Sequence, residues 1–489
     1  MVEIDKYDLC FLLLLLGSIA LRFYYFIGLD FSDDQAYVQI ANEILNGNFR
    51  PSKWILSQRL GIVFPMAFFY GIFGINEFSA SFYALLSFVV LLSFIYYFSS
   101  RYFGKREAIL ACLLFSIFPL SIEFSTTPMG DIPLGLFATL SLFVFILAIK
   151  RERPLYYLLT GLFVGVSYLI KLLGLVLLLP PLIYMLLQLP RRMKKSLKAM
   201  LIFLLGFSLS IVLEVVYYGT SVGDPLLRLS AVSYYSEPAR IATEFNTDLW
   251  FYPKLFFPHI LGGSASYFSL FFYFFFPASL FLLFSKKIEE KYLAFWSLVV
   301  LLYLQFGTMS IGSYIPIHRL PRHLLLVLPS CATVAAVFFM KIAKKYKSFY
   351  PFLLLFLILL LADFVPSWQE IYEYHQCSKE DLRISYEILK EKSPRVIVAD
   401  YGEIAHLSFY FGFPKNLTFV PILAASCDGL RDAYVMINGT RYWYDVLYRS
   451  EKLATCFKEP PSEWKLVARI KGSCGGMFGN YDAAIYYIA

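Results

Sequence analysis

Two adjacent acids, Asp33 and Asp34, follow a mostly apolar run over residues 9–29 and begin the amphipathic stretch DDQAYVQIANEIL. A carboxylate pair at the end of a membrane-length segment is costly unless it meets water, a cation or a substrate. One interpretation is structural: Ser32 or Asp33 caps a helix over Asp34–Leu45. The other is catalytic: Tyr37, Ala41 and Leu45 lie on one face, which would dock the helix and fix the direction in which Asp33 points. The pair therefore makes chemistry at a membrane surface a testable hypothesis.

A further candidate acid, Asp131, follows TTPMG and begins the apolar run DIPLGLFATL. Its structural interpretation is an ordinary helix start, with Pro133 in the first turn. If the acidic positions lie on one membrane face, Asp33, Asp34 and Asp131 form a candidate catalytic set. These three acids could also hold a divalent metal if they converge, although no metal is required.

Few cations are expected on the same face. Arg59 precedes an apolar stretch, Lys171 interrupts another, and Arg319, Arg322 and His323 lie in HRLPRHLLLVLP. A single Lys or Arg near a helix end commonly extends to the lipid headgroups. Together, however, Arg59, Lys171 and Arg322 would suit a phosphate, with Arg319 and His323 in support.

The elements that must position these residues follow from the composition. Of the 489 residues, 59% are hydrophobic and only 16% are charged, unlike soluble globular proteins. Apolar runs long enough to cross a bilayer recur from residue 9 to about 365. We expect an all-α polytopic membrane domain with about eleven transmembrane helices, the first being retained rather than cleaved. The predicted spans lie near 9–29, 79–100, 106–123, 131–149, 155–170, 172–189, 198–218, 264–285, 291–308, 320–340 and 349–365.

The net charge of +8 reflects the orientation of the chain in the membrane, and a nucleic-acid partner is not expected. The basic residues cluster in short loops at 101–106, 150–153, 191–198, 286–291 and 341–347. All five clusters become cytoplasmic if the N-terminus is cytoplasmic and Arg59–Ile75 lies on the outer interface. A single tilted helix over 155–189 is the alternative, and it would invert the later loops.

The predicted membrane domain covers 1–365, with its first outer loop at 30–78, and an extracytoplasmic α/β domain covers 366–489. Short alternating runs predict strands, and intervening stretches predict helices. The strands are expected at 395–400, 433–438, 464–470 and 483–489, and the helices near 379–391 and 402–411.

The seven cysteines fall into two groups. One or two disulfides, with the pairing open, are possible among those of the C-terminal domain. These are Cys377, Cys427, Cys456 and Cys474, whereas Cys10, Cys112 and Cys331 lie in apolar runs and are expected in the core. The small residues of GLFVGVSYLIKLLG predict helix packing, and the sequence has no phosphate loop, HExxH motif or Cys/His metal spacing.

In order and spacing, these motifs resemble a family. DDQAYVQIANEILNGNF is similar to the first-loop acidic motif of dolichyl-phosphate-mannose–protein mannosyltransferases and lipid A aminoarabinose transferases. These multi-spanning glycosyltransferases of the C-type superfamily use polyprenyl-phosphate sugars. The similarity continues through YGIFGINEFSASFYALLSF, RYFGKREA, STTPMGDIPLGLF, GLFVGVSYLIKLLGLVLLLP and RHLLLVLP, over most of 15–335.

The resemblance implies that Asp33 is the catalytic carboxylate. Asp34 occupies a position that is often Glu in the family, Arg59 and Arg322 match positive positions, and His323 replaces an aromatic residue. The implied reaction moves a sugar from a polyprenyl (dolichyl-type) phosphate to an acceptor hydroxyl on the extracytoplasmic side, with inversion. It needs a base for the hydroxyl and cations for the departing phosphate.

No cofactor is required by this chemistry. The sugar is not identified, and the acceptor is a protein, a glycan or a lipid. A multi-pass location in a plasma membrane is expected, with the endoplasmic reticulum as the alternative. Two other classes of function compete: a transporter or flippase of glycolipid-type substrates, and an inert glycan-binding protein in which Asp33 only caps its helix.

Overall fold

The computed structural model describes residues 5–30, 32–232, 248–262, 267–308, 314, 316–438, 453–471 and 482–489. It divides into two compact units. The first comprises residues 1–26, 49–65 and 81–369, and the second comprises 27–48, 66–80 and 370–489. The second unit therefore combines two segments from the first predicted loop with the C-terminal region.

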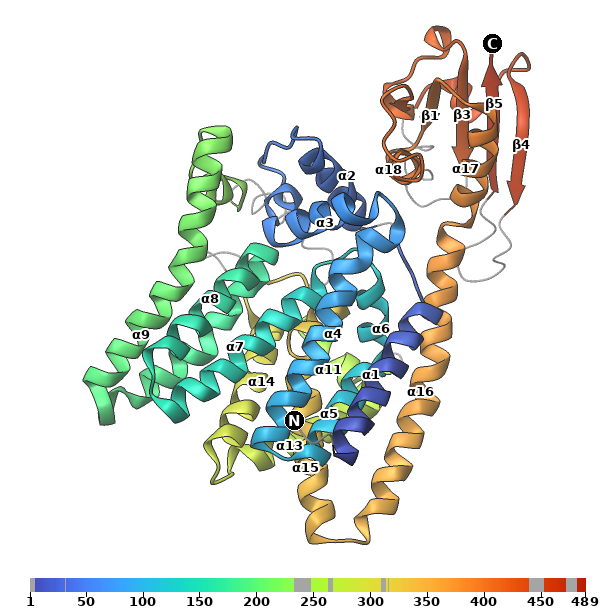
Figure 1. The fold of residues 1–489 in the computed structure, drawn as a ribbon. Coiled ribbons are helices and arrows are strands. Elements are labelled where there is room, and N and C mark those ends of the chain that lie inside the picture. The colour runs from blue at the N-terminus through green and yellow to red at the C-terminus, as the bar shows by residue number, and fades with distance from the viewer. Residues whose placement is uncertain are drawn as a thin grey trace. The chain divides into compact units, whose positions relative to one another are not determined.

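The apolar segments form helices (Figure 1). Their bounds are α1 Lys6–Tyr24, η1 Ile55–Gln58, α3 Leu60–Phe73, α4 Glu77–Tyr102, α5 Lys105–Ser116, α6 Pro119–Thr126, α7 Asp131–Arg151, α8 Pro154–Ile170, η2 Leu172–Leu178, α9 Leu179–Val222, α11 Phe251–Phe256, α12 Pro258–Leu261, α13 Ser269–Leu283, α14 Ile288–Phe306, η3 Pro321–Leu326, α15 Leu328–Lys345 and α16 Phe349–Ser378. Among the described residues, five helices are long and apolar enough to cross a membrane, or six if the bent pair α5 and α6 is one span. The multi-pass helical class is confirmed, but the count of eleven spans is not.

The stretch 155–189 is not one long helix. Lys171 has extended backbone angles, φ −148° and ψ 143°, and separates α8 from η2. The predicted split is therefore confirmed. The following two predicted spans, 172–189 and 198–218, form η2 and α9, and the backbone of α9 leaves helical geometry at Arg192, just after Pro190.

The small residues in GLFVGVSYLIKLLG serve helix packing, as predicted. Helices α7, α8 and α9 pack side by side in the first unit (Figure 1). A Cβ atom on Gly161 would lie 1.9 Å from the Phe203 carbonyl oxygen, and one on Gly165 would lie 2.3 Å from Ser210 Oγ. Only glycine allows the backbones of α8 and α9 to approach this closely.

The C-terminal part of the second unit is an α/β layer. Its helices are α17 Glu380–Lys392, α18 Tyr401–Tyr410 and α20 Thr455–Lys458, with short 3-10 turns at Ile422–Ala424 and Cys427–Gly429. Its strands are β1 Val396–Ala399, β2 Thr418–Pro421, β3 Ala433–Asn438, β4 Lys465–Lys471 and β5 Asp482–Ile488, in the sheet order β2-β1-β3-β5-β4. Strand β1 pairs in parallel with β2 and β3, whereas β5 pairs antiparallel with β3 and β4. All four predicted strands form, and β2 was not predicted.

Alternation along β1 divides the core between the two faces of the sheet. Ile397 packs with Leu382 of α17 and Leu407 of α18 on one face. Val398 packs with Phe457 on the other face. Successive strand residues point to opposite faces, so an apolar run with both faces buried is the expected signature of a central strand.

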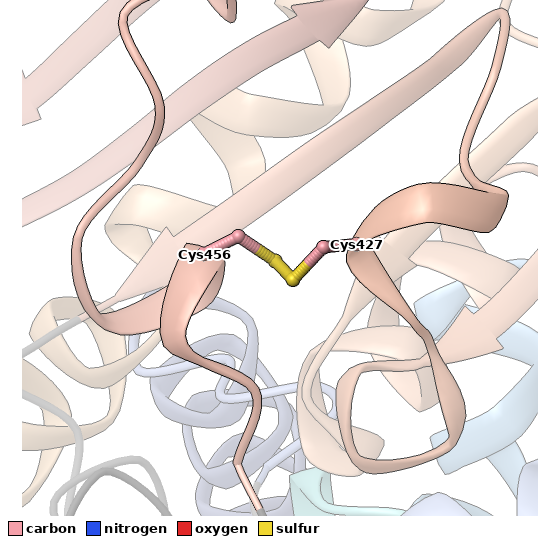
Figure 2. The surroundings of a disulfide bond; sticks show 2 residues. All are labelled: Cys427 and Cys456. Carbon is pink, nitrogen blue, oxygen red and sulfur yellow. A yellow bond between two sulfur atoms is a disulfide. The ribbon is translucent and has the colours of Figure 1, made fainter.

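A disulfide joins Cys427 and Cys456 on the second face (Figure 2). Cys377 is also disulfide-bonded, and Cys474 lies outside the described residues. Cys112 and Cys331 are free and buried, as expected, but Cys10 is exposed. The expectation of a core position for Cys10 is wrong because α1 buries little of its surface.

Candidate active site

Lys171 is held inside the first unit by a break between two helices. Its N–H donates to the Ser167 carbonyl at 3.0 Å, and its own carbonyl accepts from the Gly174 N–H at 2.8 Å. A Cβ atom on Gly174 would lie 2.4 Å from the Ser167 carbonyl carbon. Glycine therefore lets the chain fold back over the end of α8, and this fold leaves the Lys171 residue only 5% exposed.

Two more glycines bring three predicted site segments together. A Cβ atom on Gly130 would lie 2.4 Å from Ile62 Cδ1 and 3.1 Å from Ile170 Cγ2. A Cβ atom on Gly61 would lie 2.7 Å from Ile170 Cγ1. The two glycines and the two isoleucines that they contact all lie within three residues of a predicted site residue. Their close packing therefore brings together the start of α3, the start of α7 and the end of α8.

The same packing assembles the predicted charges of the first unit. Lys171 Nζ lies 2.6 Å from Asp131 Oδ1, and the two side chains are only 6% and 2% exposed. Arg59 and Arg322 act electrostatically on Lys171. Arg322 and His323 act in the same way on Asp131. Within this cluster, three cations face one carboxylate, which is a suitable environment for a phosphate.

The 3-10 turn η3 carries Arg322 and His323 to this cluster. A Cβ atom on Gly135, one turn into α7, would lie 2.7 Å from the Leu325 carbonyl oxygen, so glycine permits the contact between α7 and η3. Buried Nδ1 of His323 and Oδ2 of Asp131 have no hydrogen-bond partner in the described part of the chain. Buried polar atoms of this kind are available to a ligand.

A buried ion pair that the sequence analysis missed supports Arg59. Arg228 contacts the carboxylate of Glu214 and donates to the Gln58 carbonyl, directly before Arg59. Glu214 also accepts hydrogen bonds from Tyr168 and Tyr218, at 2.6 and 3.0 Å. The signal was present in the sequence, since Glu214 is an acid inside the apolar run 198–218.

Arg319 has a structural role in the described contacts. Its guanidinium donates to the Gln305 carbonyl at 2.9 and 3.0 Å and to the Asp248 carbonyl at 3.2 Å. Gln305 is in the last turn of α14, where carbonyl groups lack partners within the helix. Arg319 therefore ties the end of α14 to a neighbouring segment.

In the second unit, α2 spans Asp34–Leu45, as predicted. Asp33 is half-buried and stands at the N-cap position, but within the described residues its carboxylate does not cap the helix. Tyr37 and Ala41 are buried, which confirms that this face docks α2. Leu45 is 45% exposed, so the prediction that it shares this buried face is wrong.

Asp34 shapes the loop that carries Asp33. Its carboxylate accepts the backbone N–H groups of Asp30 and, at 2.9 Å, Ser32. The side chain is fully buried. Burial, and secondarily the charge of Asp30, raise the pKa of Asp34 to about 8. Asp34 therefore stabilises the loop in a largely protonated form at neutral pH.

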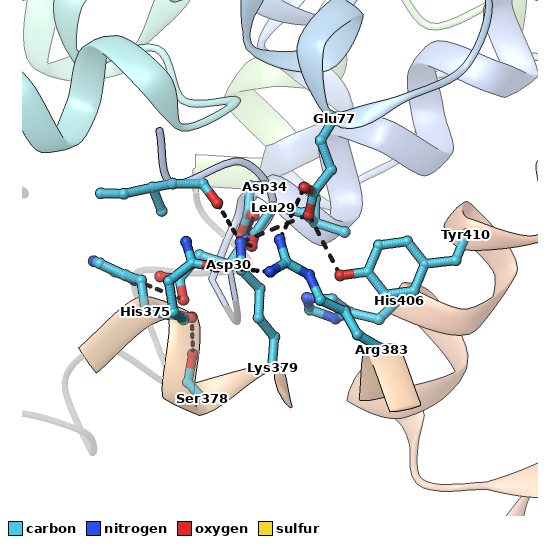
Figure 3. A network of polar contacts seen from close by, with 12 residues as sticks. Leu29, Asp30, Asp34, Glu77, His375, Ser378, Lys379, Arg383, His406 and Tyr410 are labelled. Carbon is cyan, nitrogen blue, oxygen red and sulfur yellow. Dashed lines mark hydrogen bonds and ion pairs between the residues drawn. The ribbon is translucent and has the colours of Figure 1, made fainter. Parts of the chain in front are cut away.

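Lys379 of the C-terminal region holds the same loop from within the second unit (Figure 3). Its buried ammonium donates to the Ile27 carbonyl and, at 2.9 Å, to the Leu29 carbonyl. Its Nζ also lies 3.6 Å from the carboxylate of Glu77. Between the two carbonyls, Gly28 has a φ of +76°, and a Cβ atom there would lie 2.8 Å from Glu77 Cδ. Lys379 appeared as an ordinary polar residue in the sequence, and only the fold shows its role.

Further contacts fasten the loop and α2 (Figure 3). His375 lies 3.1 Å from Asp30, and Arg383 lies 3.2 Å from Glu77. Gln35, two residues after Asp33, contacts the His406 ring at 2.8 Å. The second unit thus holds both sides of Asp33 with charged and polar groups.

The predicted residues form two groups. Arg59, Asp131, Lys171, Arg322 and His323 meet in the first unit, whereas Asp33, Asp34 and Tyr37 belong to the second. Across the described ranges, no three His, Cys, Asp or Glu side chains are grouped closely enough to hold a metal ion.

Comparisons with known proteins agree with the resemblance found in the sequence. A family model described as dolichyl-phosphate-mannose-protein mannosyltransferase matches residues 60–218. No curated protein matches the chain. The matched segment includes Asp131 and Lys171 of the cationic cluster.

Several solved structures share the fold. ArnT from Cupriavidus metallidurans in the apo state is 14% identical, with a TM-score of 0.58 and 97% of each chain covered. The same enzyme bound to undecaprenyl phosphate gives 13% identity, a TM-score of 0.57 and 97% coverage of each chain. The Archaeoglobus fulgidus oligosaccharyltransferase, in a complex with Zn and sulfate, gives 14% identity, a TM-score of 0.58, and coverage of 96% of this chain and 73% of that one. The predicted resemblance to polyprenyl-phosphate-sugar glycosyltransferases is confirmed.

Proposed function

We propose that this chain is a membrane glycosyltransferase that moves a sugar from a polyprenyl (dolichyl-type) phosphate to an acceptor hydroxyl on the extracytoplasmic face, with inversion. The observation that carries the proposal is the grouping of Arg59 and Arg322 with the buried Lys171–Asp131 pair. The family model over 60–218 and the fold shared with an undecaprenyl-phosphate complex support the same donor class.

In the proposed reaction, the cationic cluster binds the donor phosphate. Arg59 and Arg322 neutralise its charge as the bond to the sugar breaks, with Lys171 held in place by Asp131. The leaving group is already a stable anion, so no strong general acid is needed. The chemistry requires no cofactor.

Asp33 is the proposed general base. The acceptor oxygen attacks the anomeric carbon, the bond from that carbon to the phosphate oxygen breaks, and the hydroxyl proton passes to Asp33. One observation favours this assignment over that of its neighbour: Asp34 is fully buried, and its carboxylate already accepts two loop N–H groups.

The acceptor is proposed as a hydroxyl of a protein, a glycan or a lipid. One structure that shares the fold is an oligosaccharyltransferase tethered to an acceptor peptide, at 12% identity and a TM-score of 0.55. That likeness supports the fold and leaves the three acceptor classes to experiment.

The test is sugar transfer by the purified full chain in lipid nanodiscs. Radiolabelled polyprenyl-phosphate sugars, including dolichyl-phosphate mannose, are supplied with a membrane extract as the acceptor source. Asp33→Asn should lower transfer by about 10²–10⁴-fold, the usual contribution of a positioned base. Glu43→Gln is the matched control, since Glu43 lies on the same helix and, within the described part of the chain, its carboxylate accepts a hydrogen bond from the Gln39 side chain at 3.1 Å. It should keep the wild-type rate.

Donor binding is measured separately with undecaprenyl phosphate. Arg322→Gln should weaken binding by roughly ten- to a hundredfold, the value of one charge-assisted contact. Asp33→Asn should leave it unchanged. If Asp33→Asn retains most of its transfer rate, Asp33 is not the base. If the wild type only moves the glycolipid between leaflets and forms no new glycosidic bond, the chain is a transporter.

A further inference from the structure

A cavity of about 350 Å³ lies in the first unit at the turn between α7 and α8, against the bend in α9. Its apolar wall includes Tyr157, Tyr184 and Met185. Phe145 supports the wall, because it makes edge contacts with both tyrosines at centroid distances of 6.0 and 5.8 Å. This volume is within the usual range of small-molecule sites.

The bend in α9 gives the cavity its polar side. Pro190 lies inside the helix, and Arg192 has φ −146° and ψ 49°, outside the helical region. A proline removes one backbone N–H and its ring clashes with the preceding turn, so the helix kinks there. The side chains of Arg192, Lys195 and Lys198 consequently line the cavity.

The charges around the cavity are unequal. Glu152 is its only acidic lining residue among those described, and it contacts Arg192 at 2.6 Å and Lys195 at 2.9 Å. One carboxylate faces three cations, so the group carries an excess of two positive charges. Both contacts of Glu152 are exposed, with 61% and 70% of the two cationic side chains accessible, and an external anion can compete for them.

Apolar surface continues from the cavity on both sides of the bend. Leu186 and Leu187, next to Met185, are 48% and 65% exposed, and Leu197 and Leu201 beyond the bend are 45% and 69% exposed. Exposed leucines on a membrane helix face acyl chains. A ligand here would therefore have an anionic head among the cations and apolar tails along α9.

We propose that this cavity is a binding site for the phosphodiester headgroup of an anionic membrane phospholipid. The site is distinct from the cationic cluster at Asp131, because no residue is shared between them. It lies beside the basic segments 150–153, at the end of α7, and 191–198, at the bend in α9, where anionic lipids are attracted by charge. The tyrosine wall and the apolar flanks add a requirement for a lipid rather than for charge alone.

The test is native mass spectrometry of the full chain released from nanodiscs of phosphatidylglycerol and phosphatidylcholine. The wild type should retain phosphatidylglycerol. Arg192→Gln combined with Lys198→Gln should lower its retention by roughly tenfold or more. The matched control is Arg191→Gln with Lys194→Gln, which removes the same charge from the same stretch of α9 at exposed residues that do not line the cavity. The control should retain the lipid.

Glu152→Gln provides an opposite test. It removes the carboxylate that competes for Arg192 and Lys195, so lipid retention should rise above that of the wild type. This variant adds no charge to bury, and its result does not depend on how well the other variants fold. Unchanged or weaker retention in Glu152→Gln would contradict the proposal.

Two other results would overturn it. Equal loss in both double variants would show unspecific attraction of this basic stretch of α9 to an anionic surface. A second such result would be displacement of the lipid by millimolar inorganic phosphate, together with thermal stabilisation of the protein by phosphate alone that equals the stabilisation by the lipid. It would identify a site for free phosphate. Retention that depends on the cavity residues and withstands inorganic phosphate would support the lipid assignment.

Discussion

Replacing Asp131 by Asn tests the buried ion pair of the cationic cluster. The Lys171 Nζ to Asp131 Oδ1 distance is 2.6 Å, and the side chains are 6% and 2% exposed. Asn keeps the shape of Asp but leaves the Lys171 ammonium without its counter-charge, close to Arg59 and Arg322. Removing one partner of a buried pair costs about 3–5 kcal/mol of stability. Asp131→Asn should therefore lower the free energy of unfolding by about this amount.

Removing both charges should cost less than removing one. In the double variant Asp131→Asn with Lys171→Met, no charge is stranded, and Met fills most of the space of the lysine side chain. Replacement of a whole buried pair by apolar groups is often neutral, so we expect a loss of about 0–2 kcal/mol. An exposed pair provides the control: Asp248 and Lys254 are 2.8 Å apart, with side chains 42% and 41% exposed. Asp248→Asn should cost no more than about 1 kcal/mol.

The assay is reversible unfolding of the detergent-solubilised chain, followed by tryptophan fluorescence with increasing SDS. Undecaprenyl phosphate should restore more stability to Asp131→Asn than it adds to the wild type, because its phosphate replaces the missing negative charge. If Asp131→Asn is as stable as the double variant, Lys171 is not stranded by the substitution. That result would refute the reasoning from burial.

Three further predictions concern single groups. Burial raises the pKa of Asp34 from 3.8 to about 8, so between these pH values the folded protein binds more protons than the unfolded chain. The free energy of unfolding should therefore fall as the pH rises from about 4 to 8. Asp34→Asn should flatten that dependence in unfolding curves measured across this range. Lys379→Met leaves two backbone carbonyls without their donor and should cost about 1–3 kcal/mol, seen as faster hydrogen exchange at residues 27–35 with no change at α8. Gly130→Ala places a methyl group against Ile62 Cδ1 and should lower the free energy of unfolding by about 1–3 kcal/mol; it should cost less in a background that carries Ile62→Val, which removes that Cδ1 atom.

The sequence predicted elements well where the pattern depends on burial. The four predicted strands form within about one residue of their expected limits, because alternation or continuous apolar character reflects which faces are covered. Strand β2 was missed because Thr418–Pro421 is short and lies at the sheet edge, where its residues are only partly buried. A proline also ends it, which is typical of edge strands.

Apolar runs predict helices but not their bends. Helices α5 and α6 meet at 67°, a change of direction that hydropathy cannot show. Similarly, two predicted spans meet in α9 at the kink beside Pro190. The break at Lys171 was predictable because a charge inside an apolar run needs a partner or water.

The same physical rule explains which site residues could be found. Lys171, Asp131 and Arg322 are charges at the edges of apolar runs, where the cost of burial marks them as unusual. Lys379 lies in a polar segment, and a lysine there is ordinary until the fold buries it. Its two carbonyl partners are more than 300 residues away in sequence, and no local pattern connects them.

The two adjacent acids also show why type and spacing do not fix a role. Both precede the same helix, yet Asp34 is fully buried with two loop N–H groups on its carboxylate, while Asp33 is half-buried. Burial raises the pKa of the Asp34 carboxyl group, so this group is a poor base at neutral pH. Its oxygens also already accept the loop N–H groups. A general base needs an accessible lone pair aimed at the acceptor, on a rigid support. Asp34 and Lys379 stabilise the loop from two sides, and this is the physical reason that we propose Asp33, rather than Asp34, as the base.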